Sequence, residues 1–454
     1  MGLDNYIEFA MKSLLRNPII DVLRAINISK ILIQSNFIKR SVGHSPFQIL
    51  LHFVYMLVMN KRQSVFVRQN THSYCKDAYY RFTKDSRYNW RKLLLLGCAA
   101  LIKKIEPLQK SSEYRLLIID DTVEAKRGKL IEGSCKHIYS NKEKRCINGI
   151  NVVSLSYADS YSTFQLDFCL KTNDSRRLQT SDFTTDVHHK SNAHKRRVES
   201  ESSKNTLATQ MLSRALDYGI EADYLLVDSW YAKPSFIKES IELGMPVIAR
   251  VPNNALIWNF MGKHKTIDAI YNSLKDVKRT YSGKHGKISF TYFDTIVEHK
   301  TVGRCKLVFL HTGKELLVFI STDAALSGKQ ILEIYKKRWN IEQGYKDLRA
   351  YFGFGAEENR IYEALIARIT LSMFTYNILS YINRISHEPK SLGELFRDLE
   401  CELQTLAISM ERFLQILTAV ANITEIVKEN KDLLKIITLM RAYAQKELGF
   451  MCES

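Results

Sequence analysis

Two short apolar runs, each followed at once by an aspartate, constrain the fold of this chain most strongly. Arg115–Ile119 is followed by Asp120, and Tyr224–Val227 is followed by Asp228. Short apolar runs of this kind are typical of strands buried inside a sheet. Strand ends that lie beside a packed helix converge at one edge of a mixed sheet, so we expect the two aspartates to lie close together.

The pattern around these runs predicts an α/β domain over residues 111–355. A β-rich insertion is expected at about 253–323, followed by a long helix over Ser327–Tyr351. The other expected elements are strands over Asn151–Ala158, Thr163–Leu170 and Met245–Val251 and helices over Thr206–Tyr218 and Ser235–Leu243. The chain is therefore predicted to contain a mixed sheet with helices packed on it.

Helical regions are expected on both sides of this domain. Residues 1–110 have apolar positions at helical spacing, and they contain 18 Lys and Arg against 6 Asp and Glu. Since the whole chain has a net charge of +18, this region holds 12 of the excess positive charges, and we predict that it binds DNA. Residues 356–454 are also predicted to be helical, and dimerisation is the role we consider for them.

The polar stretch Thr172–Asn205 is too hydrophilic for a core. We interpret it as a surface or mobile loop and as a candidate for facing DNA. Its basic residues include Arg176, Arg177, Lys190, Lys195, Arg196 and Arg197.

Composition excludes several classes of protein. The 8 cysteines are scattered without a C-x-x-C pair, which argues against a disulfide framework and a structural zinc site. The apolar runs are shorter than the ~20 residues of a membrane span, and the first residues lack a signal-peptide core. We therefore expect a cytoplasmic protein that does not enter a membrane.

A third carboxylate stands out in the long predicted helix. Glu342 shares a helical face with side chains that recur every three or four residues, namely Tyr335, Arg338, Lys346 and Arg349. Asp120, Asp228 and Glu342 together offer the hard oxygen ligands that Mg²⁺ prefers, and two Mg²⁺ ions suit phosphodiester chemistry. Each acid alone also has a plainer interpretation: a turn or cap for the aspartates, an i,i+4 ion pair with Arg338 or Lys346 for Glu342.

These residues resemble a known family. Asp120-Asp-Thr, Leu226-Val-Asp-Ser-Trp230 and Tyr335-Lys-Lys-Arg-Trp-Asn-Ile-Glu342 are similar to the DDE transposases of bacterial insertion sequences. More narrowly, they resemble insertion-sequence family four, whose signature is Y-x2-R-x3-E-x6-K. The fourth position is Arg349 where the family usually has Lys, and Lys346 lies one turn earlier.

The resemblance implies a fold, a reaction and a set of site residues. The fold is an RNase H-like catalytic domain with a β-rich insertion between the second Asp and the Glu. Asp120, Asp228 and Glu342 become the catalytic residues and the ligands of two Mg²⁺ ions, with Mn²⁺ as the alternative metal. DNA binding is implied for the remaining four signature positions: Tyr335, Arg338, Lys346 and Arg349.

The implied function is cut-and-paste transposition by a homodimer on double-stranded DNA. The enzyme would cleave the terminal inverted repeats of its element and transfer the ends into target DNA. Two alternatives remain: a domesticated, non-catalytic DNA-binding protein and an RNase H-like nuclease without strand transfer. Two assignments also stay open, because Asp121 adjoins Asp120, and Trp258, which we interpret as a core aromatic, is a candidate for stacking on a flipped base.

Overall fold

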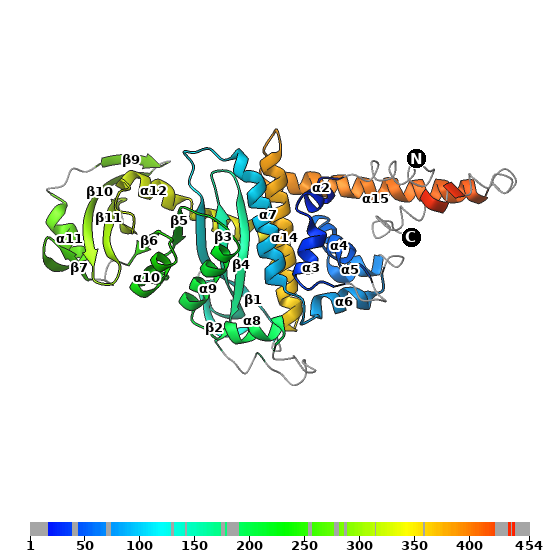
Figure 1. The fold of residues 1–454 in the computed structure, drawn as a ribbon, viewed down its shortest axis with the longest axis horizontal. Coiled ribbons are helices and arrows are strands. Elements are labelled where there is room, and N and C mark those ends of the chain that lie inside the picture. The colour runs from blue at the N-terminus through cyan, green and yellow to red at the C-terminus, as the bar shows by residue number, and fades with distance from the viewer. Residues whose placement is uncertain are drawn as a thin grey trace. The chain divides into compact units, whose positions relative to one another are not determined.

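The computed structural model divides the chain into two compact units. We call Ile102–Thr185 with His194–Lys346 the sheet unit, and Met1–Leu101 with Asp186–Ala193 and Asp347–Ser454 the helical unit. Figure 1 shows the elements of both units. The structure describes residues 17–38, 44–69, 74–128, 131–140, 143–173, 178, 190–252, 257–276, 281–285, 288–313, 315–356, 359–422, 435–436 and 438–440.

The sheet unit is built around β1 (Leu116–Ala125). β1 pairs antiparallel with β3 (Arg145–Ala158) and parallel with β5 (Tyr224–Val227). All four residues of β5 are buried, as expected of a strand that is covered on both faces. The remaining strands of this part are β2 (Cys135–Ser140) and β4 (Thr163–Lys171), both antiparallel to β3, and β6 (Val247–Val251), parallel to β5.

Two helices cover this part of the sheet. α9 (Lys204–Asp217) packs on β3 and β4, and α10 (Pro234–Glu242) packs on α9 and β6. The apolar residues of α9 recur at helical spacing and are buried, so that one face of this helix packs against the sheet. The α/β class with a mixed sheet that the sequence predicts is therefore confirmed, and the arrangement is consistent with an RNase H-like domain.

The strands of the predicted insertion continue this same sheet. β12 (Leu316–Ser321) pairs antiparallel with β6, and β11 (Gly303–His311) and β10 (Ile288–His299) follow in order. Figure 1 shows β10 and β11. The sequence predicts strands here but not this attachment, because an apolar run does not identify its pairing partner. The other elements are β7 (Ile257–Phe260), β8 (Lys263–Thr266), α11 (Ile267–Leu274) and β9 (Tyr281–His285).

The long helix expected over Ser327–Tyr351 is two helices, α12 (Gly328–Lys336) and α13 (Trp339–Tyr351). Between them, the backbone N–H groups of Lys337 and Arg338 donate to carbonyls three residues earlier. That spacing belongs to a 3₁₀ turn, which interrupts the rotation of an α-helix. The expectation that the signature residues share one continuous helical face is therefore wrong.

A capping box starts α12. The Ser327 hydroxyl accepts a hydrogen bond from the Gln330 N–H at 3.3 Å, and the Gln330 side chain accepts one from the Ser327 N–H at 2.9 Å. We expect Ser327→Ala to lower the free energy of unfolding by about 1 kcal/mol, because it removes the capping oxygen. Urea denaturation measures this loss. Ser327→Thr is the matched control, and an equal loss in both variants would contradict the capping role.

The polar stretch that was expected to be a loop contains α8 (Asn192–Ser200). Arg197 forms a buried ion pair with Glu132, with 2.6 Å between Nε and Oε1. The Arg196 guanidinium lies over the Phe168 ring and donates to the Phe168 carbonyl. The interpretation of both arginines as DNA-facing is wrong, because both are buried. Of the other basic residues named in this stretch, Lys190 and Lys195 are exposed, whereas Arg176 and Arg177 lie outside the described residues.

The helical unit is built around α14 (Tyr362–Ile385), which is buried along nearly its whole length. α2 (Pro18–Ala25), α4 (Pro46–Val58) and α6 (Lys76–Lys84) pack against it from the N-terminal region, and α15 (Leu392–Asn422) from the C-terminal region. The N-terminal and C-terminal regions, which the sequence analysis predicts as separate regions, thus share one core. The reason is that a helix with apolar residues on every face needs neighbours on every side. The remaining helices of this unit are α3 (Ile28–Gln34), α5 (Gln63–Gln69) and most of α7 (Trp90–Ile105). The end of α7 and the 3₁₀ segment η1 (Glu106–Leu108) belong to the sheet unit.

α14 is also the one helix in the described part of the chain that is long and apolar enough to cross a membrane. Of its most apolar window, 94% is buried inside the protein. A core helix that is covered on all sides has the same composition. The length of α14 is therefore weak evidence for a membrane span.

Candidate functional site

Asp120 and Asp228 follow matching positions of two neighbouring parallel strands. Ile119 of β1 pairs with Val227, the last residue of β5, and each aspartate is the next residue along the chain. The structure thus brings the two predicted aspartates to one edge of the parallel pairing, as expected. Asp120 does not end its strand, however, because β1 remains paired with β3 as far as Ala125.

Arg338 joins the first aspartate to Glu342. Its Nη1 lies 3.1 Å from Asp120 Oδ2, and its Nη2 contacts Glu342 Oε1. The side chain of Arg338 is 17% exposed, that of Asp120 15% and that of Glu342 28%. The i,i+4 pair of the plainer interpretation is therefore present, but the same guanidinium also binds a carboxylate from β1. Hydrogen bonds between ionised groups are stronger than neutral ones, so Arg338 fixes both acids.

Burial governs the protonation of the two aspartates. It raises the pKa of Asp120 to about 7; the positive charge of Arg338 opposes this, and the negative charge of Asp228 adds to it. Burial also raises the pKa of Asp228, whereas the N–H groups of Trp230 and Tyr231, which donate to its Oδ1, lower it. Neighbouring carboxylates with little access to water favour a cation between them.

Asp121 forms an ion pair with a different side chain, Lys204. Its Oδ2 lies 2.6 Å from the Lys204 ammonium, and its Oδ1 accepts a hydrogen bond from the Tyr231 hydroxyl at 3.1 Å. Burial, followed by the charges of Asp121 and Asp120, raises the pKa of that hydroxyl well above its usual value. Asp121 therefore anchors the segment after Asp228, which favours a supporting role for it beside Asp120.

Tyr345 is a residue of this site that the sequence analysis missed. It lies on α13 and is buried, and its hydroxyl donates to the Asp120 carbonyl at 3.1 Å. The same hydroxyl is 2.6 Å from the Ser154 hydroxyl on β3. Tyr345 thereby fixes the Glu342 helix to β1, and its position one turn after Glu342 was the only signal in the sequence.

The donor chemistry of the three acids fits a divalent metal. Carboxylate oxygens are the ligands that Mg²⁺ prefers. Within the ranges that the structure describes, however, no group of three His, Cys, Asp or Glu side chains is arranged to hold a metal ion. Arg338 provides the physical reason, since its guanidinium binds Asp120 and Glu342. Joint metal binding by these acids therefore requires Arg338 to release at least one of them.

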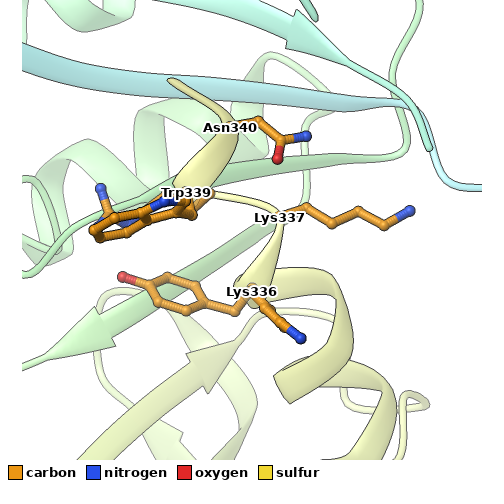
Figure 2. A pocket seen from close by; sticks show the side chains of 6 residues that line it. Lys336, Lys337, Trp339 and Asn340 are labelled. Atoms are coloured by element: carbon orange, nitrogen blue, oxygen red, sulfur yellow. The ribbon is translucent and has the colours of Figure 1, made fainter. Parts of the chain in front are cut away.

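The turn between α12 and α13 borders a cavity of about 570 Å³. Trp339 and Lys337 extend from the backbone in opposite directions there, as Figure 2 shows. Trp339 is 53% exposed, and the Lys346 ammonium lies 4.7 Å from its ring. Tyr335, in contrast, is half-buried and packs its ring against Phe319. Burial raises the pKa of the Tyr335 hydroxyl to about 12, so it remains a hydrogen-bond donor at neutral pH.

Arg349 belongs to the helical unit. It is in the last turn of α13, whose residues from Asp347 onward are part of that unit, whereas the other predicted site residues are assigned to the sheet unit. There it lines a cavity of about 780 Å³. Trp258 is fully buried in β7 against His299, which confirms its interpretation as a core aromatic.

Trp230 belongs to the motif that carries the resemblance, but the sequence analysis gave it no role. It follows Asp228 by two positions and is 43% exposed. The ammonium groups of Lys204 and Lys233 lie 4.9 Å and 4.7 Å from its ring centre. An exposed indole beside cations is suited to a nucleobase and its phosphates.

Comparison with known families agrees with this geometry. A DDE superfamily endonuclease domain matches residues 48–264, and a transposase DDE domain matches residues 184–378. The chain is similar to DDE endonucleases and transposases. The first match contains Asp120 and Asp228, and the second contains Asp228 and Glu342. No curated protein matches the sequence.

These two DDE matches support a nuclease-type enzyme with DNA as its substrate class. Domains of this superfamily generally use divalent metals, in agreement with the acidic donors at the sheet edge. The comparisons therefore confirm the predicted class of enzyme, a DDE transposase or endonuclease.

Proposed function

We propose that the chain is a cut-and-paste transposase that cleaves the terminal inverted repeats of its own element and transfers them into target DNA. The observation that carries the proposal is the pairing of Arg338 with both Asp120 and Glu342, beside Asp228 at the end of the neighbouring parallel strand and within the DDE matches. The spacing of Tyr335, Arg338 and Glu342 supports assignment to insertion-sequence family four. The working form is a homodimer on double-stranded DNA in the cytoplasm.

Each residue has a role in this proposal. Asp120, Asp228 and Glu342 would hold two Mg²⁺ ions, with Mn²⁺ as a substitute. The bound metal would activate the attacking oxygen and neutralise the leaving one. Arg338 exchanges its contacts with the acids for a contact with a DNA phosphate. Its planar guanidinium group suits a phosphate because it can donate two parallel hydrogen bonds. Tyr335, Lys346 and Arg349 bind the DNA backbone, and Asp121 supports Asp120. Residues 1–110 supply most of the positive charge for binding.

One experiment separates this function from its alternatives. A supercoiled plasmid that carries the gene with its flanking DNA is incubated with the purified protein and Mg²⁺. Excision followed by joining into new sites supports a transposase. Cleavage without joining identifies a nuclease, and specific binding without cleavage identifies a DNA-binding protein.

Trp230 provides a sharper prediction about DNA positioning. Trp230→Ala is expected to weaken cleavage of element ends about tenfold at limiting DNA, since base–aromatic stacking contributes roughly 1–3 kcal/mol. Saturating DNA should restore most of the rate, because Trp230 is not a metal ligand. Trp230→Phe is the matched control and should retain most of the activity. If Ala and Phe variants behave alike, Trp230 does not stack on DNA.

A further inference from the structure

Arg338 neutralises two of the acids that the proposed metal site needs. Its guanidinium Nη1 lies 3.1 Å from Asp120 Oδ2, its Nη2 contacts Glu342 Oε1, and all three side chains are largely buried. An arginine side chain keeps its positive charge at every physiological pH. The protein therefore supplies a cation of its own to two carboxylates that are proposed to bind metal.

The two acids are also held near each other by contacts that do not involve Arg338. Glu342 lies on α13, and Tyr345 of the same helix donates a hydrogen bond to the Asp120 carbonyl at 3.1 Å. The Tyr345 hydroxyl is 2.6 Å from the Ser154 hydroxyl on β3. Because these bonds fix α13 to the sheet, the Arg338 side chain can move away without separating the elements that carry Asp120 and Glu342.

A cavity beside Arg338 offers an anion a place to compete with the acids. This cavity of about 570 Å³ is lined by Arg338 and by Lys336 and Lys337 from the same turn (Figure 2). Three consecutive cations attract an anion to this point. A phosphate, like a carboxylate, accepts two parallel hydrogen bonds from a guanidinium group. Arg338 thus has two alternative sets of partners, the acids of its own chain and a phosphate in the cavity.

We propose that the pairing of Arg338 with Asp120 and Glu342 is an autoinhibitory contact, which keeps the affinity for divalent metal low until a DNA phosphate binds Arg338. This inference rests on the proposed function, which supplies the DNA and the metal. It goes further, because it makes DNA and metal bind cooperatively. Thermodynamic linkage then requires each ligand to raise the affinity for the other by the same factor. Protein without DNA would bind metal weakly, which limits cleavage of DNA that is not properly bound.

The first test measures Mn²⁺ binding to the full chain without DNA, from the electron paramagnetic resonance signal of the free ion. Arg338→Ala is expected to bind Mn²⁺ about 5- to 150-fold more tightly than the wild type, the usual range of coupling between two ligands. Arg338→Lys should lie between them, since it keeps the charge but lacks the guanidinium group that contacts both acids. Lys336→Gln is the matched control, because it removes an equal charge from an exposed side chain two residues earlier, and it should change the affinity much less.

The second test uses the wild-type protein and does not depend on the folding of a variant. A saturating DNA duplex with the sequence that flanks the gene should raise the Mn²⁺ affinity of the wild type by a similar factor. The Mn²⁺ that the DNA binds alone is measured separately and subtracted. The same duplex should raise the affinity of Arg338→Ala much less, because the autoinhibitory contact is already absent from that variant.

Two outcomes would overturn the proposal. The first is an Arg338→Ala protein that is folded by circular dichroism and binds Mn²⁺ no more tightly than Lys336→Gln. The second is a DNA duplex that raises the Mn²⁺ affinity of the wild type no more than that of Arg338→Ala. Neither test measures cleavage. Wild-type protein that binds both metal and DNA but leaves the DNA intact would therefore count against the proposed function and not against the autoinhibitory contact.

Discussion

Replacing Asp120 or Asp228 by Asn, or Glu342 by Gln, is expected to reduce metal-dependent DNA cleavage by a factor on the order of 10³ or more. Each change removes a charged oxygen that the proposed metal site needs. DNA binding in EDTA should be retained, because phosphate attraction comes from Lys and Arg rather than from acids that repel phosphate. Gel analysis of element-end cleavage and anisotropy of the same DNA measure the two properties.

Two further variants control this result. Glu242→Gln removes an exposed acid on α10, 62% exposed, and should leave cleavage unchanged. Asp121→Asn should reduce cleavage less than Asp120→Asn, since the Asp121 carboxylate binds Lys204 and Tyr231. Full cleavage activity in Asp228→Asn would exclude the triad. A greater loss in Asp121→Asn than in Asp120→Asn would reverse the assignment of the two neighbours.

Arg338→Ala is expected to destabilise the protein by about 3–5 kcal/mol above pH 7, because it leaves buried carboxylates without their cation. The loss should depend on pH. The positive charge of Arg338 holds down the pKa of Asp120, which burial nevertheless raises to about 7. A carboxyl with a raised pKa in the folded state favours folding when it is protonated and loses that advantage as the pH rises through its pKa. The deficit of the variant should therefore shrink below pH 7, where Asp120 needs no partner.

Urea denaturation of wild type, Arg338→Ala and Arg338→Lys over pH 5–9 checks this expectation. The Lys variant keeps the positive charge but lacks the guanidinium group that contacts both acids. Its loss of unfolding free energy should therefore be intermediate. If the loss of unfolding free energy is the same over the whole pH range, Arg338 stabilises the protein by packing rather than by its charge. The further role of Arg338 in holding a DNA phosphate stays a prediction.

Local patterns in the sequence predicted much of the sheet unit. β5 has the predicted bounds, because four consecutive apolar residues between polar ones leave little choice of where the strand begins and ends. The meeting of Asp120 and Asp228 followed from the parallel pairing of two such runs. Arg338 and Glu342 were predicted from spacing, and the i,i+4 contact depends only on one helical turn.

The features that the sequence did not predict depend on contacts between distant residues. Nothing in Tyr335–Glu342 marks the 3₁₀ turn: no proline or glycine lies there, and Arg338 is held by Asp120 from another element. Arg196 and Arg197 look like surface residues until Phe168 and Glu132 are known to lie beside them. Periodicity gives the type of an element, whereas the partners of a charged side chain come from the whole fold.

The order in which the core of the helical unit is synthesised has a consequence for the life of the protein in the cell. α6 ends at Lys84, and α14, which it packs against, begins at Tyr362. At about 5–20 residues per second, a ribosome needs roughly 15–55 s to make the chain between them. During that time the apolar faces of α4 and α6 lack their partner. A product that ends before α14 should therefore aggregate or be degraded, so premature termination would not release a basic fragment able to occupy DNA in competition with the full chain.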